Sequence, residues 1–254
     1  MTDNSEVGQP CEFVALPTQG RRYIVSRRVG LGDVDRSGRL RLDSLAAYLQ
    51  DVASEDADVS GLDDVFGWIV RRVEVRISRW PRLAETLTLT TFCAGTGSRW
   101  AERRTSIHGA DGEAVEGGAI EAAAIWVAID ARGRPVRLSE QFQAIYGEAA
   151  AGREVSARLS LPARPAVVES REWPLRRVDF DVLGHVNNAA HWCAVEELVG
   201  DRRPRAATIE FGPALTESPV VRFVNDGSVL RVWIGESSTV EVRFAAPQAR
   251  PSKP

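Results

Sequence analysis

The sequence predicts an α+β fold built from two copies of one unit, and three observations carry this prediction. In each half, a single amphipathic helical segment is followed by strand-like runs in which apolar and polar residues alternate. An antiparallel meander beside one helix is an α+β arrangement, in which the sheet must cover something apolar. The halves also align without a gap, because Asp33-Val-Asp-x-x-Gly38 matches Asp179-Phe-Asp-x-x-Gly184 directly before each helical segment.

The first half begins with a β-rich segment at 23–29 and a loop rich in glycine and aspartate at 30–38. Leu42, Leu45 and Leu49 then recur at three- and four-residue spacing, which predicts a helix of about three turns that ends before residue 59. The strand-like runs that follow are 68–79, 86–92, 99–108, 119–129 and 133–138. They predict the antiparallel sheet of this half.

The second half repeats this order after a stretch at 147–171 that has the prolines and small residues of a linker. The strand-like runs are 173–180, 206–211, 220–224, 228–234 and 239–244, and the helical spacing covers 188–199. We therefore expect an N-terminal unit at 21–146 and a C-terminal unit at 172–246. The polar, proline-containing ends at 1–20 and 247–254 are expected to be disordered.

Composition narrows the class of protein. The 254-residue chain can bury a sizeable core, and its formal net charge of -3 argues against a nucleic-acid partner. Its three cysteines are far apart and form no Cys-x-x-Cys pair, which indicates neither a disulfide framework nor a zinc site. The first residues lack a signal-peptide pattern, and no apolar run is long enough to cross a membrane. These features predict a cytoplasmic protein that does not act in a membrane.

The residues best suited to chemistry lie in the second copy of the repeated loop, Asp179-Phe-Asp-Val-Leu-Gly-His-Val-Asn-Asn188. Asp181 could attack a carbonyl or take a proton from water, and His185 could orient a substrate or shuttle a proton. Asn187 or Asn188 would cap the helix, whose free N–H groups could stabilise an oxyanion. The corresponding positions of the first copy hold Arg39, Arg41 and Leu42. The polar set is therefore present in one copy only.

Two such units, with Arg177-x-Asp-x-Asp-x-x-Gly-His-Val-Asn-Asn188 in the second, resemble the acyl-ACP thioesterases, which are double hotdog proteins. In the first half, Trp68-Ile-Val-Arg-Arg and Ser98-Arg-Trp-Ala-Glu-Arg-Arg104 look like the family's N-terminal domain. The resemblance implies two tandem hotdog units, each a long helix wrapped by an antiparallel sheet. It also implies hydrolysis of a fatty acyl thioester of acyl carrier protein (ACP), or of CoA, without a metal or an organic cofactor. The N-terminal unit would bind the acyl chain and the C-terminal unit would carry the reacting residues.

Carried over by position, Asp181 and His185 stand at the family's aspartate and histidine, and Asn187 and Asn188 stand at its Asn-Asn pair. We therefore expect Asp181 and His185 to be catalytic. The two asparagines are expected to position the substrate or the oxyanion.

The other polar residues near this loop are expected to have structural or secondary roles. Asp179 is expected to be structural, by pairing with Arg177 or by turning the loop, and His191 is expected to be partly buried and structural. Glu196 and Glu197 are kept as a candidate second carboxylate, because some hotdog thioesterases place one on this helix. Without that role, they would simply solvate the helix.

Two departures from the plant enzymes of the family leave alternatives open. Leu183 stands where those enzymes have a catalytic asparagine, and their glutamate-cysteine pair falls near Ala214 and Leu215. A non-catalytic acyl-binding protein, or a hydratase or dehydratase on the same scaffold, therefore remains an alternative. Because the two units are expected to pair with each other, a monomer would be sufficient, and a homodimer of such pairs is also compatible.

Overall fold

The computed structural model describes residues 13–63, 66–109, 119–166 and 168–244. The disorder predicted at 1–12 and 247–254 lies outside the described residues. The predicted disordered segment also includes Phe13 and Val14, and here the prediction is wrong. The Phe13 ring lies against the guanidinium groups of Arg76 and Arg104, at 4.3 and 3.9 Å, and the Val14 carbonyl accepts a hydrogen bond from Arg104 Nε at 3.4 Å.

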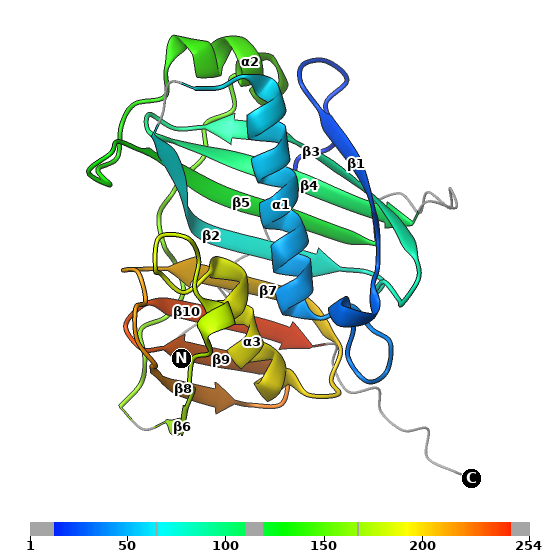
Figure 1. The fold of residues 1–254 in the computed structure, drawn as a ribbon, viewed down its shortest axis with the longest axis vertical. Helices are drawn as coiled ribbons and strands as arrows, with labels where there is room; N and C mark the ends of the chain where they lie inside the picture. Colours follow the sequence, from blue (N-terminus) through cyan, green and yellow to red (C-terminus); the bar gives the residue numbers. More distant parts are fainter. Residues whose placement is uncertain (1–12, 64–65, 110–118, 167, 245–254) are drawn as a thin grey trace, which may run out of the picture.

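Among the described residues, one antiparallel sheet of ten strands runs through both units, in the order β1-β3-β4-β5-β2-β7-β10-β9-β8-β6 (Figure 1). The N-terminal unit supplies β1 (Tyr23–Arg28), β2 (Gly67–Ile77), β3 (Thr86–Thr96), β4 (Trp100–Gly109) and β5 (Ile120–Ile129). The C-terminal unit supplies β6 (Glu169–Glu172), β7 (Pro204–Phe211), β8 (Val220–Asn225), β9 (Val229–Ile234) and β10 (Ser238–Phe244). β2 pairs with β7 at the centre, so the strand order of one unit mirrors that of the other.

Two helices, α1 (Leu42–Ser60) and α3 (Asn188–Val199), lie side by side across one face of this sheet (Figure 1). The predicted α+β fold, with one helix lying on the strands of each unit, is therefore confirmed, and the strands of the two units join in one sheet. α3 has the predicted bounds, whereas α1 begins as predicted but runs for 19 residues, well beyond three turns. Gly61 ends α1 in the left-handed region, at φ +72°. None of the described helices is both long and apolar enough to span a membrane.

The hydrophobic core continues from one unit to the other beneath the two helices. Val52 of α1 and Val195 of α3 are fully buried, as is Val240 of β10, and all belong to one packed cluster. Each fully buried valine or leucine side chain stabilises the fold by about 1.5–3 kcal/mol relative to an exposed one. The two units therefore stabilise each other and are not independent modules joined by a tether.

Two segments predicted as strands have other structures. Residues 133–138 follow a turn in which the Asp130 carboxylate accepts hydrogen bonds from the N–H groups of Arg132 (2.8 Å) and Arg134 (2.9 Å), and they form no strand. Residues 173–180 contain a 3-10 turn, Arg177–Asp179, and the edge strand β6 lies just before them.

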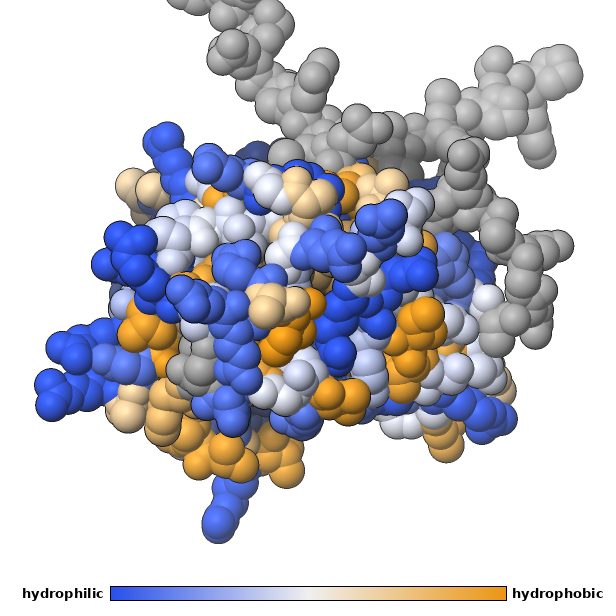
Figure 2. All heavy atoms as spheres, turned by 90° about the horizontal axis from the view of Figure 1, so that it is seen from above, coloured by the Kyte–Doolittle hydropathy of each residue, from blue (hydrophilic) through white to orange (hydrophobic). Residues whose placement is uncertain are grey.

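One helix, α2 (Glu140–Ala150), is missing from the sequence prediction. Ser139 caps it by accepting a hydrogen bond from the Phe142 N–H at 3.0 Å, and its buried side packs against β3. The range predicted as a linker, 147–171, therefore begins within α2 and reaches into β6. Seen from the α2 end, the surface carries mostly polar side chains with separate apolar clusters between them (Figure 2).

His191 lies on the core side of α3, as the helical spacing predicts. Its side chain is 2% exposed, its Nδ1 is 2.9 Å from the Ser238 hydroxyl, and its ring makes T-shaped contacts with Phe211 and Trp173. Burial lowers the pKa of His191 to about 4, because the charged imidazole would lose its hydration in this apolar setting. The histidine is thus a neutral structural residue.

The buried His191 makes stability depend on pH. Between pH 6.5 and about 4, the unfolded chain binds a proton on this side chain and the folded protein does not. The free energy of unfolding should therefore decrease as the pH is lowered from 6.5 to about 4, by up to about 3 kcal/mol. Urea unfolding of the wild type and His191→Gln at pH 7 and pH 4.5 measures this. An equal loss in both proteins would contradict the role of His191.

Candidate active site

The second repeated loop is closed by one oxygen of the Asp181 carboxylate. Oδ1 accepts hydrogen bonds from the backbone N–H groups of Leu183 (2.8 Å) and His185 (3.0 Å), and the Asp181 N–H donates to the His185 carbonyl (2.8 Å). Gly184 supplies the left-handed residue of the turn, at φ +76°. The side-chain hydrogen bonds of the turn thus both fall on Oδ1.

The first repeated loop has the same backbone construction around Asp35. Its Oδ1 accepts hydrogen bonds from the N–H groups of Ser37 (2.8 Å) and Arg39 (3.0 Å), and its Oδ2 accepts one from Arg39 Nε (2.7 Å). Burial alone would raise the pKa of Asp35, but the hydrogen bonds from Ser37 and Arg39 outweigh it and hold the pKa well below its ordinary value. The Arg39 side chain is 1% exposed and lies 4.5 Å from the Trp80 ring. Both oxygens of Asp35 are therefore engaged within the protein.

Glu196 belongs to this first site. Its Oε2 accepts a hydrogen bond from the Leu42 N–H at the start of α1 (3.0 Å), and its Oε1 pairs with Arg39. Burial raises the pKa of Glu196, and the contacts with Leu42 and Arg39 oppose that rise. Asn188, where α3 begins, lies eight residues earlier, about 12 Å along the helix axis. The prediction of Glu196 as a second carboxylate beside Asp181 is therefore corrected.

The start of α3 is the counterpart of this arrangement in the second copy. Asn188 takes the place of Leu42, and the register of the repeat puts Gln50 of α1 where α3 has Glu196. The Asn188 N–H is a helix-start amide, which α3 itself cannot pair. Because Asn188 and Gln50 line the same cavity, an oxygen atom of a ligand could take the place that the Glu196 carboxylate fills at Leu42.

That cavity has a volume of about 600 Å³ and lies mostly within the N-terminal unit, between α1, strands β4 and β5, and α2. The C-terminal unit contributes Asp181 and Asn188 to its wall. A narrower cavity of about 30 Å³ adjoins it between α1 and the sheet, and Gln50, Arg103, Trp126 and Asn188 line both. A chain-like ligand that enters beside Asp181 could thus extend into the N-terminal unit.

Of the predicted site residues, Asp181 and Asn188 line this cavity, and the others are not among its lining residues. His185 is half-buried and shapes the loop through its backbone, and Asn187 caps α3 through its side chain. Glu197 is exposed to solvent, which fits its expected role in solvating the helix.

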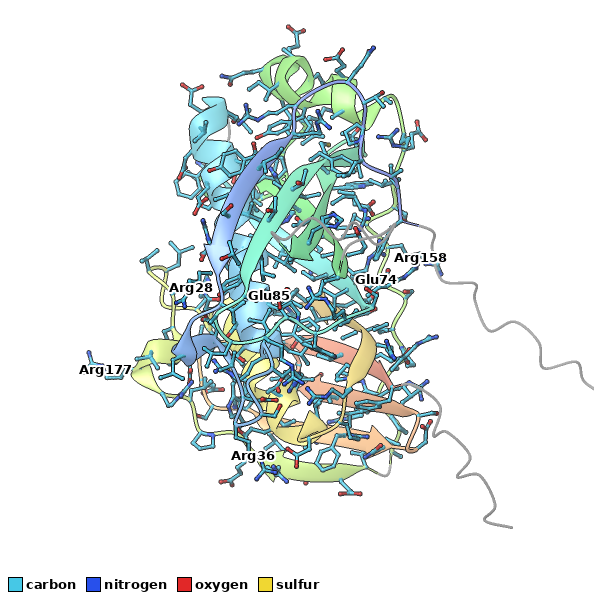
Figure 3. The ribbon with its side chains drawn as sticks, turned by 90° about the vertical axis from the view of Figure 1, so that its right-hand side faces the viewer. Arg28, Arg36, Glu74, Glu85, Arg158 and Arg177 are labelled. Carbon is cyan, nitrogen blue, oxygen red and sulfur yellow. The ribbon has the colours of Figure 1, made fainter. Side chains whose placement is uncertain are left out.

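Asp179 is 2% exposed and is structural, as expected, but its partner differs from the predicted one. Its carboxylate pairs with Arg176 at 2.7 Å, whereas Arg177 points away from the body of the protein (Figure 3).

The sequence departs from the plant enzymes at Leu183 and near Leu215. Leu183 is 71% exposed at the loop tip. Leu215 is buried, and its carbonyl accepts a hydrogen bond from the Val186 N–H of the loop at 2.8 Å.

Sequence reasoning missed Gln50, although the signal was present. The offset that aligns Asp33 with Asp179 also aligns Gln50 with Glu196, the helix position already considered for a carboxylate. What the alignment could not supply is that Glu196 reaches the start of α1 and that Gln50 lines a cavity together with the start of α3.

The N-terminal unit matches a known protein family. Residues 20–146, half of the chain, match the model of the acyl-ACP thioesterase N-terminal domain. Over a longer range, the chain is 28% identical to an uncharacterized protein of Mycobacterium tuberculosis across 228 residues, which are 87% of this chain and 89% of the relative.

Two solved structures resemble most of the chain. The 12:0-ACP thioesterase from Umbellularia californica has a TM-score of 0.71 at 18% identity, over 90% of this chain and 99% of its own. An acyl-ACP thioesterase from Bacteroides thetaiotaomicron has a TM-score of 0.69 at 18% identity, over 88% of this chain and 98% of its own. At this identity the likeness is one of fold, and it confirms the predicted double hotdog architecture.

The two sites should respond differently to matched substitutions. Glu196→Ala should lower the free energy of unfolding by about 3 kcal/mol, because it leaves the buried Arg39 guanidinium with one carboxylate partner fewer. Gln50→Ala should cost less than about 1 kcal/mol, since Gln50 faces a cavity. Urea unfolding at pH 7 measures both. Equal losses would contradict the view that Glu196 belongs to a closed network of charges and Gln50 to the wall of a cavity.

Proposed function

The chain belongs to the acyl-ACP thioesterase family, and from that premise we propose that it hydrolyses fatty acyl thioesters where Asp181 and Asn188 meet the cavity. Membership of the family makes the chain a thioester hydrolase; the fatty acyl substrate and the residue roles are the proposed part. One observation carries the proposal. The Leu42 N–H of the first copy holds a carboxylate oxygen, whereas its counterpart at Asn188 belongs to a residue that lines an open cavity.

In the proposed reaction, the thioester carbonyl oxygen accepts a hydrogen bond from the Asn188 N–H, as Glu196 Oε2 does from the Leu42 N–H at 3.0 Å. The positive end of the α3 dipole favours the negative charge that develops on this oxygen. Asp181 Oδ2 either attacks the carbonyl carbon, forming an acyl anhydride that a water then hydrolyses to the free acid, or takes a proton from a water that attacks the carbonyl carbon directly. The carrier thiolate leaves, and His185 is the proposed donor of the proton that it takes up.

Gln50 is proposed to face the reacting carbonyl from α1. Its side-chain amide can donate a hydrogen bond to the carbonyl oxygen or accept one from the attacking water. Because the amide carries no charge, it does not compete for the Asn188 N–H as strongly as a carboxylate would. The substrate can therefore reach the helix start that Glu196 occupies in the other copy.

The same cavity supports a proposal for how the substrate is held. The acyl chain would extend from Asp181 into the N-terminal unit, and the carrier, ACP or CoA, would remain outside. Both units supply residues to one site, so a single chain is sufficient, and a homodimer of such chains would keep the site unchanged. The proposed reaction takes place in the cytoplasm and requires no metal, organic cofactor, nucleic acid or membrane.

Replacing Asp181 by asparagine tests the reaction most directly. Asp181→Asn keeps an oxygen that can accept the hydrogen bonds from Leu183 and His185, so the loop should stay folded. It removes the carboxylate, and thiol release should fall by at least about a hundredfold. The assay measures thiol release from acyl-ACP and acyl-CoA substrates of graded chain length.

The matched control is Asp35→Asn in the first loop, which should lower stability through its contact with Arg39 and leave kcat unchanged. Wild-type turnover in Asp181→Asn would remove the catalytic assignment. Tight acyl binding by the wild type without release of thiol from any thioester would instead establish a non-catalytic acyl-binding protein.

A second prediction concerns Gln50. Gln50→Glu introduces at the second site the carboxylate that occupies the first, and this carboxylate should accept the hydrogen bond of the Asn188 N–H. It should therefore lower kcat/KM at pH 7 by at least about tenfold, roughly 1.4 kcal/mol. Gln50→Ala, which leaves the N–H free, should retain more activity than Gln50→Glu. The reverse order would contradict the proposed carbonyl site.

A further inference from the structure

The narrow cavity of about 30 Å³ lies where the two units meet, between α1, the start of α3 and strands β2, β4, β5 and β7. Gln50 and Asn188, which face the reacting carbonyl in the proposed site, belong to its wall as well as to the wall of the large cavity. The acyl carbons next to the carbonyl would therefore lie where the two cavities adjoin.

The wall of the narrow cavity consists mainly of hydrocarbon side chains. Leu49 of α1, Val73 of β2, Ala124 of β5 and Phe211 of β7 belong to it. An alkyl group that enters from the reaction site would exchange contacts with water for contacts with hydrocarbon. That exchange is favourable in proportion to the apolar area that leaves water.

The other polar residues of this wall have their polar groups engaged or buried. The Thr105 hydroxyl lies 3.1 Å from the Thr91 hydroxyl, and the Arg103 guanidinium pairs with the carboxylate of Asp56 at 2.6 Å. The indole nitrogen of Trp126 is buried. A water molecule needs about two to four polar partners, so this cavity suits an alkyl group better than water.

The size of the narrow cavity limits it to a small group. A cavity needs at least about 10–15 Å³ to hold a group the size of a water molecule. About 30 Å³ is therefore room for a methyl or an ethyl group and not for a fatty acyl chain. The large cavity, at about 600 Å³, takes the chain itself. A chain with a short branch beside the carbonyl would thus fill both cavities.

The position of the cavity selects the carbon that carries the branch. A carbonyl held by the Asn188 N–H puts C2 of the acyl chain one bond from the reacting centre, between the two cavities. Ala189 and Trp192 of α3 and Phe211 of β7 line the narrow cavity and not the large one. Because the narrow cavity lies on this one side of the chain, it would accept a branch in one of the two configurations at C2.

We propose, on the basis of the function proposed above, that the preferred substrates are acyl thioesters with a methyl branch at C2, and that the narrow cavity binds this branch. Moving one methyl group from water to a hydrocarbon wall improves binding about fourfold. A straight chain makes no use of this wall. Ala124 and Phe211 are thus specificity-determining residues of the acyl site.

The test measures thiol release from thioesters of equal main-chain length whose acyl groups are straight, 2-methyl in either configuration, or 2-ethyl. The two 2-methyl enantiomers have the same intrinsic reactivity, so the ratio of their kcat/KM values reports on the site alone. In the wild type, this ratio should be at least about tenfold, the scale on which a hydrophobic pocket discriminates one methyl group.

Ala124→Val fills the narrow cavity with two further methyl groups. Ala124 lies on β5, where a β-branched residue suits the strand, and it lines the narrow cavity and not the large one. The substitution should lower kcat/KM for the preferred enantiomer at least about fivefold more than for the straight substrate, and it should bring the enantiomer ratio close to one. The matched control is Ala101→Val, which adds the same groups to the wall of the large cavity and should keep the ratio.

Two further measurements apply should Ala124→Val fail to fold. Phe211→Leu removes part of a side chain from the wall of the narrow cavity, so it should raise kcat/KM for the 2-ethyl substrate relative to the 2-methyl one. Inhibition of the wild type by the free acids should be about fourfold stronger for the matching 2-methyl acid than for the straight acid.

An enantiomer ratio near one in the wild type, or the same ratio in Ala124→Val as in the wild type, would overturn this inference and leave thioester hydrolysis in place. Equal inhibition by the straight acid and both 2-methyl acids, or an unchanged preference between ethyl and methyl branches in Phe211→Leu, would overturn it in the same way. Absence of thiol release from every substrate by folded wild-type protein would overturn the proposed function and, with it, the inference.

Discussion

The pairing of β2 with β7 is the constraint on which the rest of the structure depends. It joins the two units in antiparallel register, from Arg72 opposite Glu210 to Arg76 opposite Ala206. Because each helix lies across the strands of its own unit, this pairing lays α1 against α3. The start of each helix then meets the side of the other helix. Glu196 of the C-terminal unit thereby completes the first repeated loop, and Gln50 of the N-terminal unit lines the cavity beside the second.

The starts of α1 and α3 share this geometry but differ in the side chains that surround them. At the start of α1, the charges of Asp35, Arg39 and Glu196 satisfy one another, and the helix-start amide is occupied. Breaking such a buried network is costly, so this site contributes to stability. At the start of α3, the helix of the other unit presents the neutral Gln50 and a cavity remains. One copy of the repeat thus holds a closed network of charges, and the other leaves a cavity.

The sequence was sufficient for features that depend on local pattern, such as the bounds of α3 and the loop around Asp181. It failed at features set by contacts distant in the chain. α2 was missed because its packing against β3, through residues such as Phe142, stabilises a helix of only 11 residues. Gln50 and Trp126 could not be assigned from the sequence, because their positions in the cavity depend on how the α1 and β5 elements pack together.

The comparison of the two loops also shows why a motif alone does not identify a reactive carboxylate. Asp35 and Asp181 make the same turn hydrogen bonds through Oδ1, so the turn explains both aspartates without any chemistry. The difference lies on the Oδ2 side. Arg39 has a long, permanently charged side chain that binds this oxygen and reaches Glu196. His185 has a shorter ring at the same position, and Asp181 stays at the cavity wall. The exchange of one side chain separates a structural aspartate from a candidate catalytic one.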